Sequence, residues 1–295
     1  MAGVDIPAPV PVDRPLVDVV VVTHQSYAWI GRCLDSLMTQ EGIGLVVVVD
    51  SGSTDGTAQV VAQYASLGVC WQAMGVNRGF GAGANRGISA TASEFVFVGN
   101  PDLILEPHCL KALRGALADN NRLAIVGPQV CDLDGAIYPS ARSFPNLLDA
   151  VGHGFLGLIW KGNPWSQRYL QPDRIDWISG TAMLIRRSAF ESVGGFDESY
   201  FMYVEDVDLS WRLNEQGWQV ALNREAVVRH AIGGSSETAP YRMIAAHHVS
   251  LWRFARRTRR GVNRAVLPLI GFGLVARALL VAARRTVHHR PPAVR

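Results

Sequence analysis

This sequence of 295 residues lacks several features that define familiar protein classes. Its four cysteines form no CxxC pair, which excludes a zinc ribbon and a small disulfide scaffold and indicates reduced thiols. Residues 1–15 contain four prolines and no apolar stretch, so they are expected to form a flexible leader and not a signal peptide. Only 18% of the residues are charged and 48% are hydrophobic, so most of the chain can bury a core.

A dinucleotide-binding fingerprint is also absent. The glycine-rich stretch 77–87 (NRGFGAGANRG) has no GxGxxG register, because Ala84 stands where a third glycine would follow Gly79 and Gly81. This disfavours a dehydrogenase. What remains is a glycine-rich entry to a helix whose polar residues can meet a nucleotide or a diphosphate. These polar residues are Asn77, Arg78 and Asn85.

The pattern from Leu16 to Arg122 alternates short β-branched runs with longer amphipathic segments, which is typical of βαβ units and a parallel sheet. Strands are expected at 18–23, 45–49, 94–98 and 176–187, and helices at 27–40, 54–65, 188–193 and 205–216. Ser26 is expected to cap the first helix. The stretch 131–174 is rich in Gly, Pro, Trp and Tyr, and predicts an ordered, irregular excursion over a binding cleft.

Small and acidic residues follow two of the expected strands, as residues 50–55 (DSGSTD) and 100–102 (NPD). The carboxyl ends of parallel strands share one edge of a sheet, where α/β proteins bind ligands. Asp50 and Asp55 suit hydrogen bonds to a base or ribose, although a helix cap with a turn explains them equally well. Beside them, Asp102 predicts a divalent cation, Mn²⁺ or Mg²⁺, that bridges diphosphate oxygens.

Three acids, Glu205, Asp206 and Asp208, open the last of these helices after aromatic residues. Ordinary capping by acids at the positive end of a helix is one interpretation. The other is that an apolar approach leaves a carboxylate partly desolvated, as a general base requires, which makes Glu205 and Asp206 catalytic candidates. His230 follows another expected strand and is either a core histidine or a metal ligand.

Arginine is abundant in the C-terminal segment 241–295, which fits an anionic lipid surface, a nucleic acid or a solvated tail. Residues 265–276 are almost entirely apolar, but Arg277 follows before the roughly 20 apolar residues that a bilayer span needs. We therefore expect a helix that lies in the membrane interface. A helix packed on the protein's own core is the alternative.

In their order along the chain, these motifs resemble the family-2 glycosyltransferases, inverting enzymes of the GT-A fold. The resemblance extends from about residue 18 to residue 234, through VVVVT, VDSGSTDGT, NRGFGAGAN, GNPD, WISGTAMLIRR, GGFDESYFMYVEDVDLSWR and RH. It implies an α/β domain at 16–240, in which a mostly parallel nucleotide-binding sheet is flanked by helices. Residues 16–130 would bind the nucleotide and 131–240 the acceptor, and basic amphipathic helices at 241–295 would meet a membrane.

The resemblance also implies residue roles. Asp206 would be the catalytic base with Glu205 beside it, and Asp102 and His230 would bind the metal. The residues implied in substrate binding are Thr23, Asp50, Ser53, Asp55, Asn77, Gly79, Asn85, Ser179, Gly180 and Arg212. The sequence departs from the family pattern at His24-Gln25, where Tyr-Asn is frequent, and at Asn100, which replaces the first acid of a DxD motif. One carboxylate would then do most of the metal binding.

Within the family, YPSAR (138–142), GNPW (162–165) and FMYVEDVDL (201–209) look like actinobacterial rhamnosyltransferases. They imply transfer of L-rhamnose from dTDP-L-rhamnose to N-acetylglucosaminyl-diphosphoryl-polyprenol in cell-wall synthesis, at the cytoplasmic face of the plasma membrane. No nucleic-acid partner is expected. The alternatives are a family-2 enzyme that uses UDP-galactose, UDP-glucose or GDP-mannose, and a non-catalytic membrane-associated scaffold.

Overall fold

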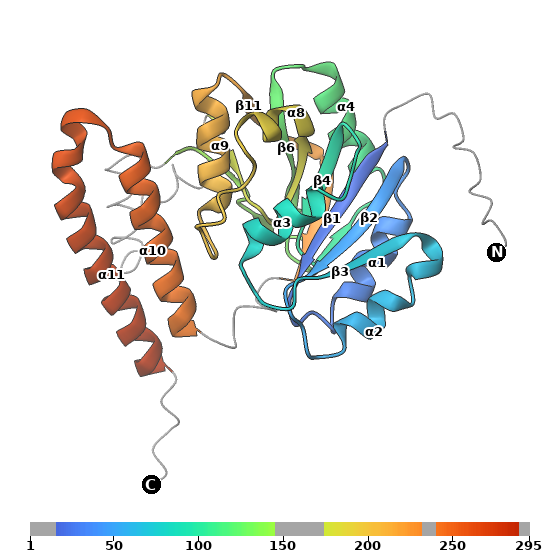
Figure 1. The fold of residues 1–295 in the computed structure, drawn as a ribbon, viewed down its shortest axis with the longest axis horizontal. Helices are drawn as coiled ribbons and strands as arrows, with labels where there is room; N and C mark the ends of the chain where they lie inside the picture. Colours follow the sequence, from blue (N-terminus) through green and yellow to red (C-terminus); the bar gives the residue numbers. More distant parts are fainter. Residues whose placement is uncertain (1–15, 145–173, 232–239, 289–295) are drawn as a thin grey trace, which may run out of the picture.

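The computed structural model describes residues 16–144, 174–231 and 240–288. In this part of the chain, nine strands form one sheet in the order β3-β2-β1-β4-β10-β6-β11-β5, with β7 paired to β6 (Figure 1). The leader at 1–15, the GNPW run and most of the predicted excursion lie outside the described residues.

The elements have the following bounds. The strands of the main sheet are β1 (Val17–Thr23), β2 (Ile43–Asp50), β3 (Val69–Ala73), β4 (Phe95–Gly99), β5 (Leu103–Leu105), β6 (Leu123–Cys131), β7 (Ile137–Tyr138), β10 (Ala182–Arg186) and β11 (Gln219–His230). A second sheet pairs β8 (Ala141–Arg142) with β9 (Trp177–Ile178). The helices are α1 (Ile30–Met38), α2 (Thr57–Ala62), η1 (Ala65–Leu67), α3 (Phe80–Ile88), α4 (Cys109–Asp119), α8 (Arg187–Ser192), α9 (Glu205–Glu215), α10 (Pro240–Thr258), η3 (Gly261–Val266) and α11 (Leu267–His288).

The predicted α/β fold is confirmed, and its parallel strands are those of the first half of the chain together with the pair β6 and β11. Strands β3, β2, β1 and β4 pair in parallel, as their buried valine runs predict. Strand β10 then pairs antiparallel with both β4 and β6. Of the strands that begin after residue 130, β7, β10 and β11 therefore extend the main sheet, whereas β8 and β9 pair in the second one.

Three local predictions are wrong. The first helix begins at Ile30, and the Ser26 hydroxyl does not cap it, because it donates to the His24 carbonyl while the Ser26 N–H donates to Thr57 Oγ1. The strand expected at 176–187 is divided into β9 and β10 by a turn at residues 179–181. The stretch expected to be irregular begins with two short strands, β7 and β8, which pair with β6 and β9.

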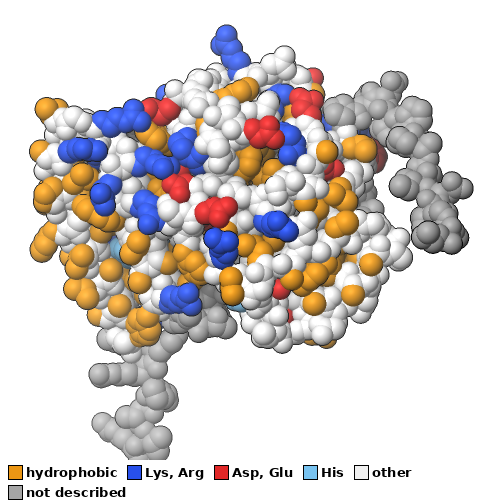
Figure 2. Space-filling view, in the orientation of Figure 1, with side chains coloured by type: hydrophobic (Ala, Val, Ile, Leu, Met, Phe, Trp, Pro, Cys, Tyr) orange, Lys and Arg blue, Asp and Glu red, His pale blue; other side chains and the backbone are white. Residues whose placement is uncertain are grey.

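Helices α10 and α11, joined by η3, form a C-terminal hairpin beside α9 (Figure 1). Arg277 does not interrupt the outer face of α11, because its Nη1 lies 3.1 Å from His248 Nε2 on α10. Hydrophobic side chains line the outer edge of the hairpin (Figure 2). The large exposed ones on α11 include Leu269, Phe272, Val275 and Leu279, each more than 60% exposed. Contrary to the sequence-based expectation, residues 261–286 are long and apolar enough to cross a membrane.

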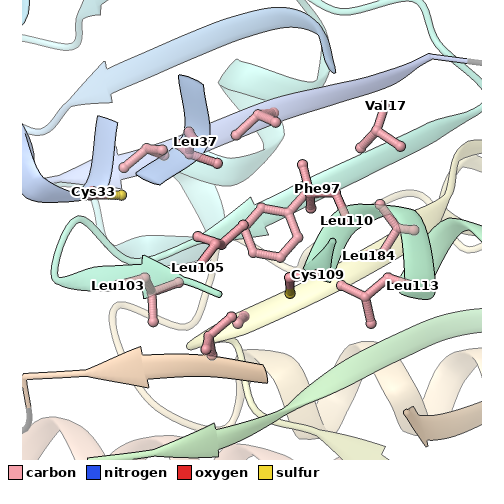
Figure 3. Close-up of a cluster of buried hydrophobic side chains, with 14 of the residues drawn as sticks. Val17, Cys33, Leu37, Phe97, Leu103, Leu105, Cys109, Leu110, Leu113 and Leu184 are labelled. Carbon is pink, nitrogen blue, oxygen red and sulfur yellow. The ribbon is translucent and has the colours of Figure 1, made fainter. Parts of the chain in front are cut away.

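Alternate residues of the central strands pack on opposite faces of the sheet. Val19 and Val21 of β1 join the buried cluster under α1 and α4, which Figure 3 shows around Phe97 and Leu110. The opposite cluster, under α3, α8 and α9, takes Val20 and other buried residues of β1, β2 and β4. The sheet is therefore covered on both faces, and its carboxyl edge remains the place for a ligand.

Helix α3 lies so close to β1 that its inner positions require glycine. A Cβ atom on Gly83 would lie 2.6 Å from Val22 Cγ1, and one on Gly87 would overlap the Val20 side chain. The spacing of four residues places both glycines on one face of the helix. Part of the glycine-rich stretch thus serves helix–strand packing.

We predict that Gly87→Ala destabilises the protein by about 1–3 kcal/mol through overpacking. Gly115→Ala in α4 is the matched control, because a Cβ atom there meets nothing within 4 Å. That change should stabilise the protein by about 0.5–1 kcal/mol, since alanine restricts the unfolded chain. Urea unfolding at constant m-value measures the free energy of unfolding of both variants. Equal stability of the two variants would refute the close packing.

Candidate active site

The carboxyl ends of β1, β2 and β4 meet at one edge of the sheet, as predicted. The parallel register sets Thr23 opposite Asp50. The turn at 179–181, which precedes the antiparallel β10, reaches the same edge, where the Asn100 N–H donates to the Thr181 carbonyl at 3.0 Å. The expected nucleotide and metal residues therefore lie at or just after strand ends, whereas the expected base Asp206 opens α9 and is contacted by this turn.

The loops that follow β1 and β2 are joined to each other at this edge. Backbone N–H groups of the first loop donate to side-chain oxygens of the second, in the pairs Gln25–Ser53, Ser26–Thr57 and Tyr27–Asp55, at 2.8–2.9 Å. Asp50 accepts hydrogen bonds from the N–H groups of Gly52 and Ser53. Asp50, Ser53 and Asp55 thus hold the two loops in place through bonds within the protein. Thr23 Oγ1 is buried without a hydrogen-bond partner among the described residues.

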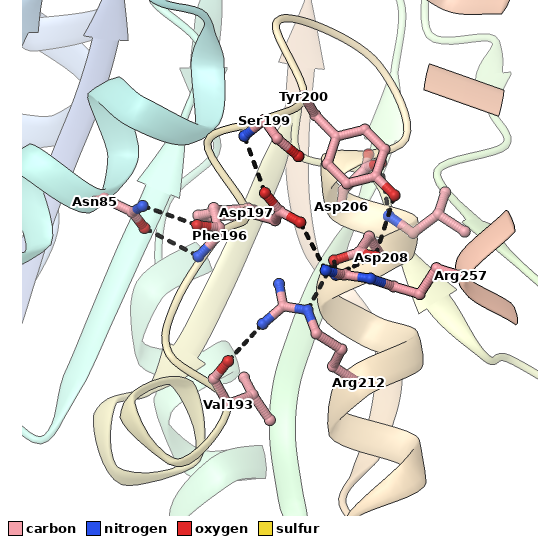
Figure 4. A network of polar contacts seen from close by, with 11 residues as sticks. Asn85, Val193, Phe196, Asp197, Ser199, Tyr200, Asp206, Asp208, Arg212 and Arg257 are labelled. Carbon is pink, nitrogen blue, oxygen red and sulfur yellow. Dashed lines mark hydrogen bonds and ion pairs between the residues drawn. The ribbon is translucent and has the colours of Figure 1, made fainter. Parts of the chain in front are cut away.

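The entry to α3 holds two of the other predicted residues. Asn77 Oδ1 accepts the Gly79 N–H at 2.9 Å, and a Cβ atom on Gly79 (φ 99°) would overlap the Phe201 carbonyl, so only glycine fits. Asn85, also predicted to bind the substrate, has an amide that pairs with both the N–H and the carbonyl of Phe196 at 2.9 Å (Figure 4). It secures the turn at Phe196.

Glu205 and Asp206 open α9 directly after a strained backbone. Tyr203 and Val204 have φ values of 67° and 70°, in the left-handed region that β-branched residues rarely enter. Such strain is often found where a side chain must be held in a functional position. Here Asp206 Oδ2 accepts the Gly180 N–H at 2.8 Å, which orients its carboxylate at the carboxyl edge.

The two acids differ in their exposure to solvent and in the groups that shift their pKa values. Glu205 is buried, and burial together with repulsion from Asp206 raises its pKa to about 8. Burial also raises the pKa of Asp206, although the N–H groups of Gly180 and Val207 and the Arg142 charge oppose that shift. Asp206 is partly exposed. Burial therefore favours a protonated carboxyl within this pair, and Asp206, the more exposed of the two acids, suits the role of general base.

Asp102 and His230 lie side by side because β5 and β11 pair antiparallel, with Leu103 opposite His230. His230 Nε2 lies 3.1 Å from Asp102 Oδ1, yet this buried oxygen accepts no hydrogen bond from the described residues. His230 Nδ1 also lacks a partner there. Within the described ranges, no group of three or more His, Cys, Asp or Glu side chains forms a metal site. Two protein ligands are enough for a cation that binds mainly to substrate phosphates.

Arg212, also predicted to bind the substrate, contacts other groups of the protein. Its guanidinium donates to Asp208 Oδ2 and to the Val193 carbonyl, each at 2.7 Å (Figure 4). Asp208 is fully buried and also accepts hydrogen bonds from Arg257 and from the Tyr200 hydroxyl. Arg212 is thus part of a network behind the acid pair.

Sequence analysis assigned no role to two arginines that act on this site. Arg142 lies over the Trp177 ring at 5.4 Å, and its charge lowers the pKa of Asp206. In the sequence, Arg257 is one of many arginines in the basic C-terminal segment, and nothing there distinguishes it from the others. A buried acid such as Asp208 requires a cationic partner, but the sequence contains no signal that selects an arginine 49 residues away.

Comparisons with known proteins agree with this geometry. Residues 18–194 match the profile of Glycosyl transferase family 2. An N-acetylglucosaminyl-diphospho-decaprenol L-rhamnosyltransferase of Mycobacterium tuberculosis is 38% identical over 268 residues, which cover 84% of this chain and 87% of the relative. Rhamnosyltransferase WbbL of Escherichia coli is 28% identical over 68% of this chain and 78% of its own length.

Among solved structures, a mannosyltransferase from Pyrobaculum calidifontis superposes with a TM-score of 0.61 at 20% identity, covering 97% of this chain and 79% of that chain. This likeness supports the predicted GT-A fold. The dehydrogenase and scaffold alternatives are excluded, because the family match covers the strand-end motifs and the rhamnosyltransferase relative extends over most of the chain. The chain is a glycosyltransferase and belongs to glycosyl transferase family 2.

Proposed function

We propose that this glycosyltransferase moves L-rhamnose from dTDP-L-rhamnose to N-acetylglucosaminyl-diphosphoryl-polyprenol. The sugar and the acceptor are supported by the relative at 38% identity, whose name specifies L-rhamnose and N-acetylglucosaminyl-diphospho-decaprenol. The catalytic part of the proposal depends on one observation. The Asp206 carboxylate, held by the Gly180 N–H, lies at the same sheet edge as Asp102.

In the proposed reaction, Asp206 removes the proton of the acceptor hydroxyl as that oxygen bonds to the anomeric carbon. The bond between this carbon and the nucleoside diphosphate breaks on the opposite face, so the configuration inverts. Glu205, protonated through its raised pKa, adds no second negative charge next to the base. The strained turn at Tyr203 and Val204 fixes the position of Asp206 before the acceptor arrives.

Asp102 and His230 fit a divalent cation, because each has a buried polar atom without a hydrogen-bond partner among the described residues. A bound Mn²⁺ or Mg²⁺ would neutralise charge on the departing diphosphate. The structurally similar mannosyltransferase was solved in complex with GDP-Man and Mn²⁺. Thr23, with its unpartnered hydroxyl, and the loops shaped by Asp50 and Asp55 would receive the nucleoside.

We predict that Asp102→Asn and Asp206→Asn fail in different ways. Asp102→Asn should weaken metal-dependent dTDP binding and turnover together, because it removes a ligand on the nucleotide side. Asp206→Asn should lose about 10²- to 10⁴-fold in turnover while it binds dTDP with nearly unchanged affinity. Calorimetry with dTDP and Mn²⁺ measures the nucleotide affinity of each variant, and a transfer assay measures its turnover. Near-normal turnover of Asp206→Asn would show that another acid is the catalytic base.

We predict that dTDP-L-rhamnose is turned over faster than UDP-galactose, UDP-glucose or GDP-mannose. The assay follows radiolabel transfer to a polyprenyl-diphosphate-linked N-acetylglucosamine, with the Asp206→Asn protein as the blank. Equal or faster transfer from one of the other donors would overturn the rhamnosyl assignment but leave the reaction class unchanged.

We propose further that the protein associates with the cytoplasmic face of the plasma membrane, where its lipid-linked acceptor would lie. The outer face of α11 offers exposed Leu269, Phe272 and Leu279 to the acyl chains. Arg264 in η3, just before this helix, and Arg284 near its end can meet anionic headgroups. Figure 2 shows basic side chains gathered over the same part of the molecule as the hydrophobic edge.

We predict that Leu279→Glu weakens binding to vesicles of zwitterionic and anionic phospholipid by about tenfold or more, because it removes a buried leucine and adds a charge. Leu67→Glu is the matched control, since Leu67 is 61% exposed in η1 and Leu279 is 67% exposed. Sedimentation with vesicles measures both. Unchanged sedimentation of Leu279→Glu would show that this face does not meet the lipid.

A further inference from the structure

Helix α10 contacts the residues that carry the acid pair along most of its length. The family profile ends at residue 194, before both this helix and the catalytic segment, which we define as residues 200–208. Four side chains along α10 contact four consecutive residues of the catalytic segment, 200–203. Two are cation–π contacts, in which the guanidinium of Arg242 lies 5.2 Å from the centre of the Phe201 ring and that of Arg253 lies 5.6 Å from the centre of the Tyr200 ring. The rings of His247 and Tyr203 pack edge to face, with their centres 5.3 Å apart. The Ser250 hydroxyl donates a hydrogen bond to the Met202 carbonyl at 3.0 Å.

The apolar contacts of α10 fall on the same segment. Phe254 is buried in a cluster with Tyr200, Val204 and Val207. Val204 is one of the two residues with a left-handed backbone, so α10 packs directly against the strained turn. A strained conformation persists only where the surrounding structure over-determines it. In this protein α10 supplies much of that surrounding structure.

The last contact is an ion pair. Arg257 Nη1 lies 2.8 Å from both carboxylate oxygens of Asp208, and its Nη2 lies 2.8 Å from Asp197 Oδ2 (Figure 4). Asp208 is fully buried two residues after Asp206. Arg257 therefore joins the first turn of α9 to the segment before it, on either side of the strained turn.

We propose that α10 positions the Glu205–Asp206 pair, with Arg257 and Ser250 as positioning residues. The C-terminal hairpin is then part of the catalytic machinery as well as a membrane contact. This inference rests on the proposed function only in that Asp206 is the base. Ser250 holds the carbonyl that precedes the strained turn, and Arg257 holds the helix that follows it.

The test compares Arg257→Gln, Arg257→Lys and Ser250→Ala in the full-length chain. Arg257→Gln should lower kcat by about 10²-fold, the effect of a misplacement near 1 Å, while the KM for the donor and the dTDP affinity stay nearly unchanged. Arg257→Lys keeps the charge and should recover part of kcat. Ser250→Ala should lower kcat by about fivefold, as expected for one lost hydrogen bond. It tests the proposal even if Arg257→Gln does not fold.

Arg260→Gln is the matched control. Arg260, between α10 and η3, also joins the hairpin to α9, but through an exposed pair with Glu215 at 3.2 Å and a contact over the Trp211 ring at 5.3 Å. Neither contact reaches the catalytic segment, so the loss of Arg260 should leave kcat within about twofold. Unchanged kcat in folded Arg257→Gln or Ser250→Ala would overturn the proposal. So would equal losses of turnover and dTDP affinity in both variants, which would indicate a general loss of structure. A wild-type chain that uses another donor would overturn the proposed specificity and leave this comparison valid.

Discussion

The active site depends on one buried charge, the carboxylate of Asp208. It is fully buried, and it is compensated by Arg212 from the next turn of α9, by Arg257 from α10 and by the Tyr200 hydroxyl. Removing one partner from such a group is costly, because the remaining charge stays out of water. The network therefore requires α9 and α10 to keep one relative position, and this position places the acid pair.

The same network explains why the start of α9 can hold unfavourable conformations and charges. Two consecutive residues have left-handed backbones, and an acid with a pKa raised to about 8 follows them directly. Each feature alone would destabilise a helix start. Together they leave Asp206 oriented by the Gly180 N–H and partly open to solvent, while Glu205 remains buried behind it.

Much of this arrangement could be predicted from the sequence, because it follows from local patterns. Valine runs predicted the parallel strands, and strand-end acids predicted the sheet edge that carries Asp50 and Asp102. Contacts between residues far apart in the chain could not be predicted. Asn85 pairs with Phe196, which is 111 residues away, and no local pattern indicates that the two pair. Arg277 was expected to interrupt an apolar face, because sequence spacing alone did not show that its side chain turns toward His248.

The hairpin has a geometric consequence for substrate selection. Since α10 is fixed to α9 by a buried ion pair and α11 carries the exposed apolar face, the active site keeps a constant height above any bilayer that the hairpin contacts. The proposed lipid-linked acceptor would have its diphosphate at the level of the headgroups, so the sugar that is modified would be the one that lies at that height. The enzyme would then discriminate acceptors by glycan length without a contact to the end of the glycan.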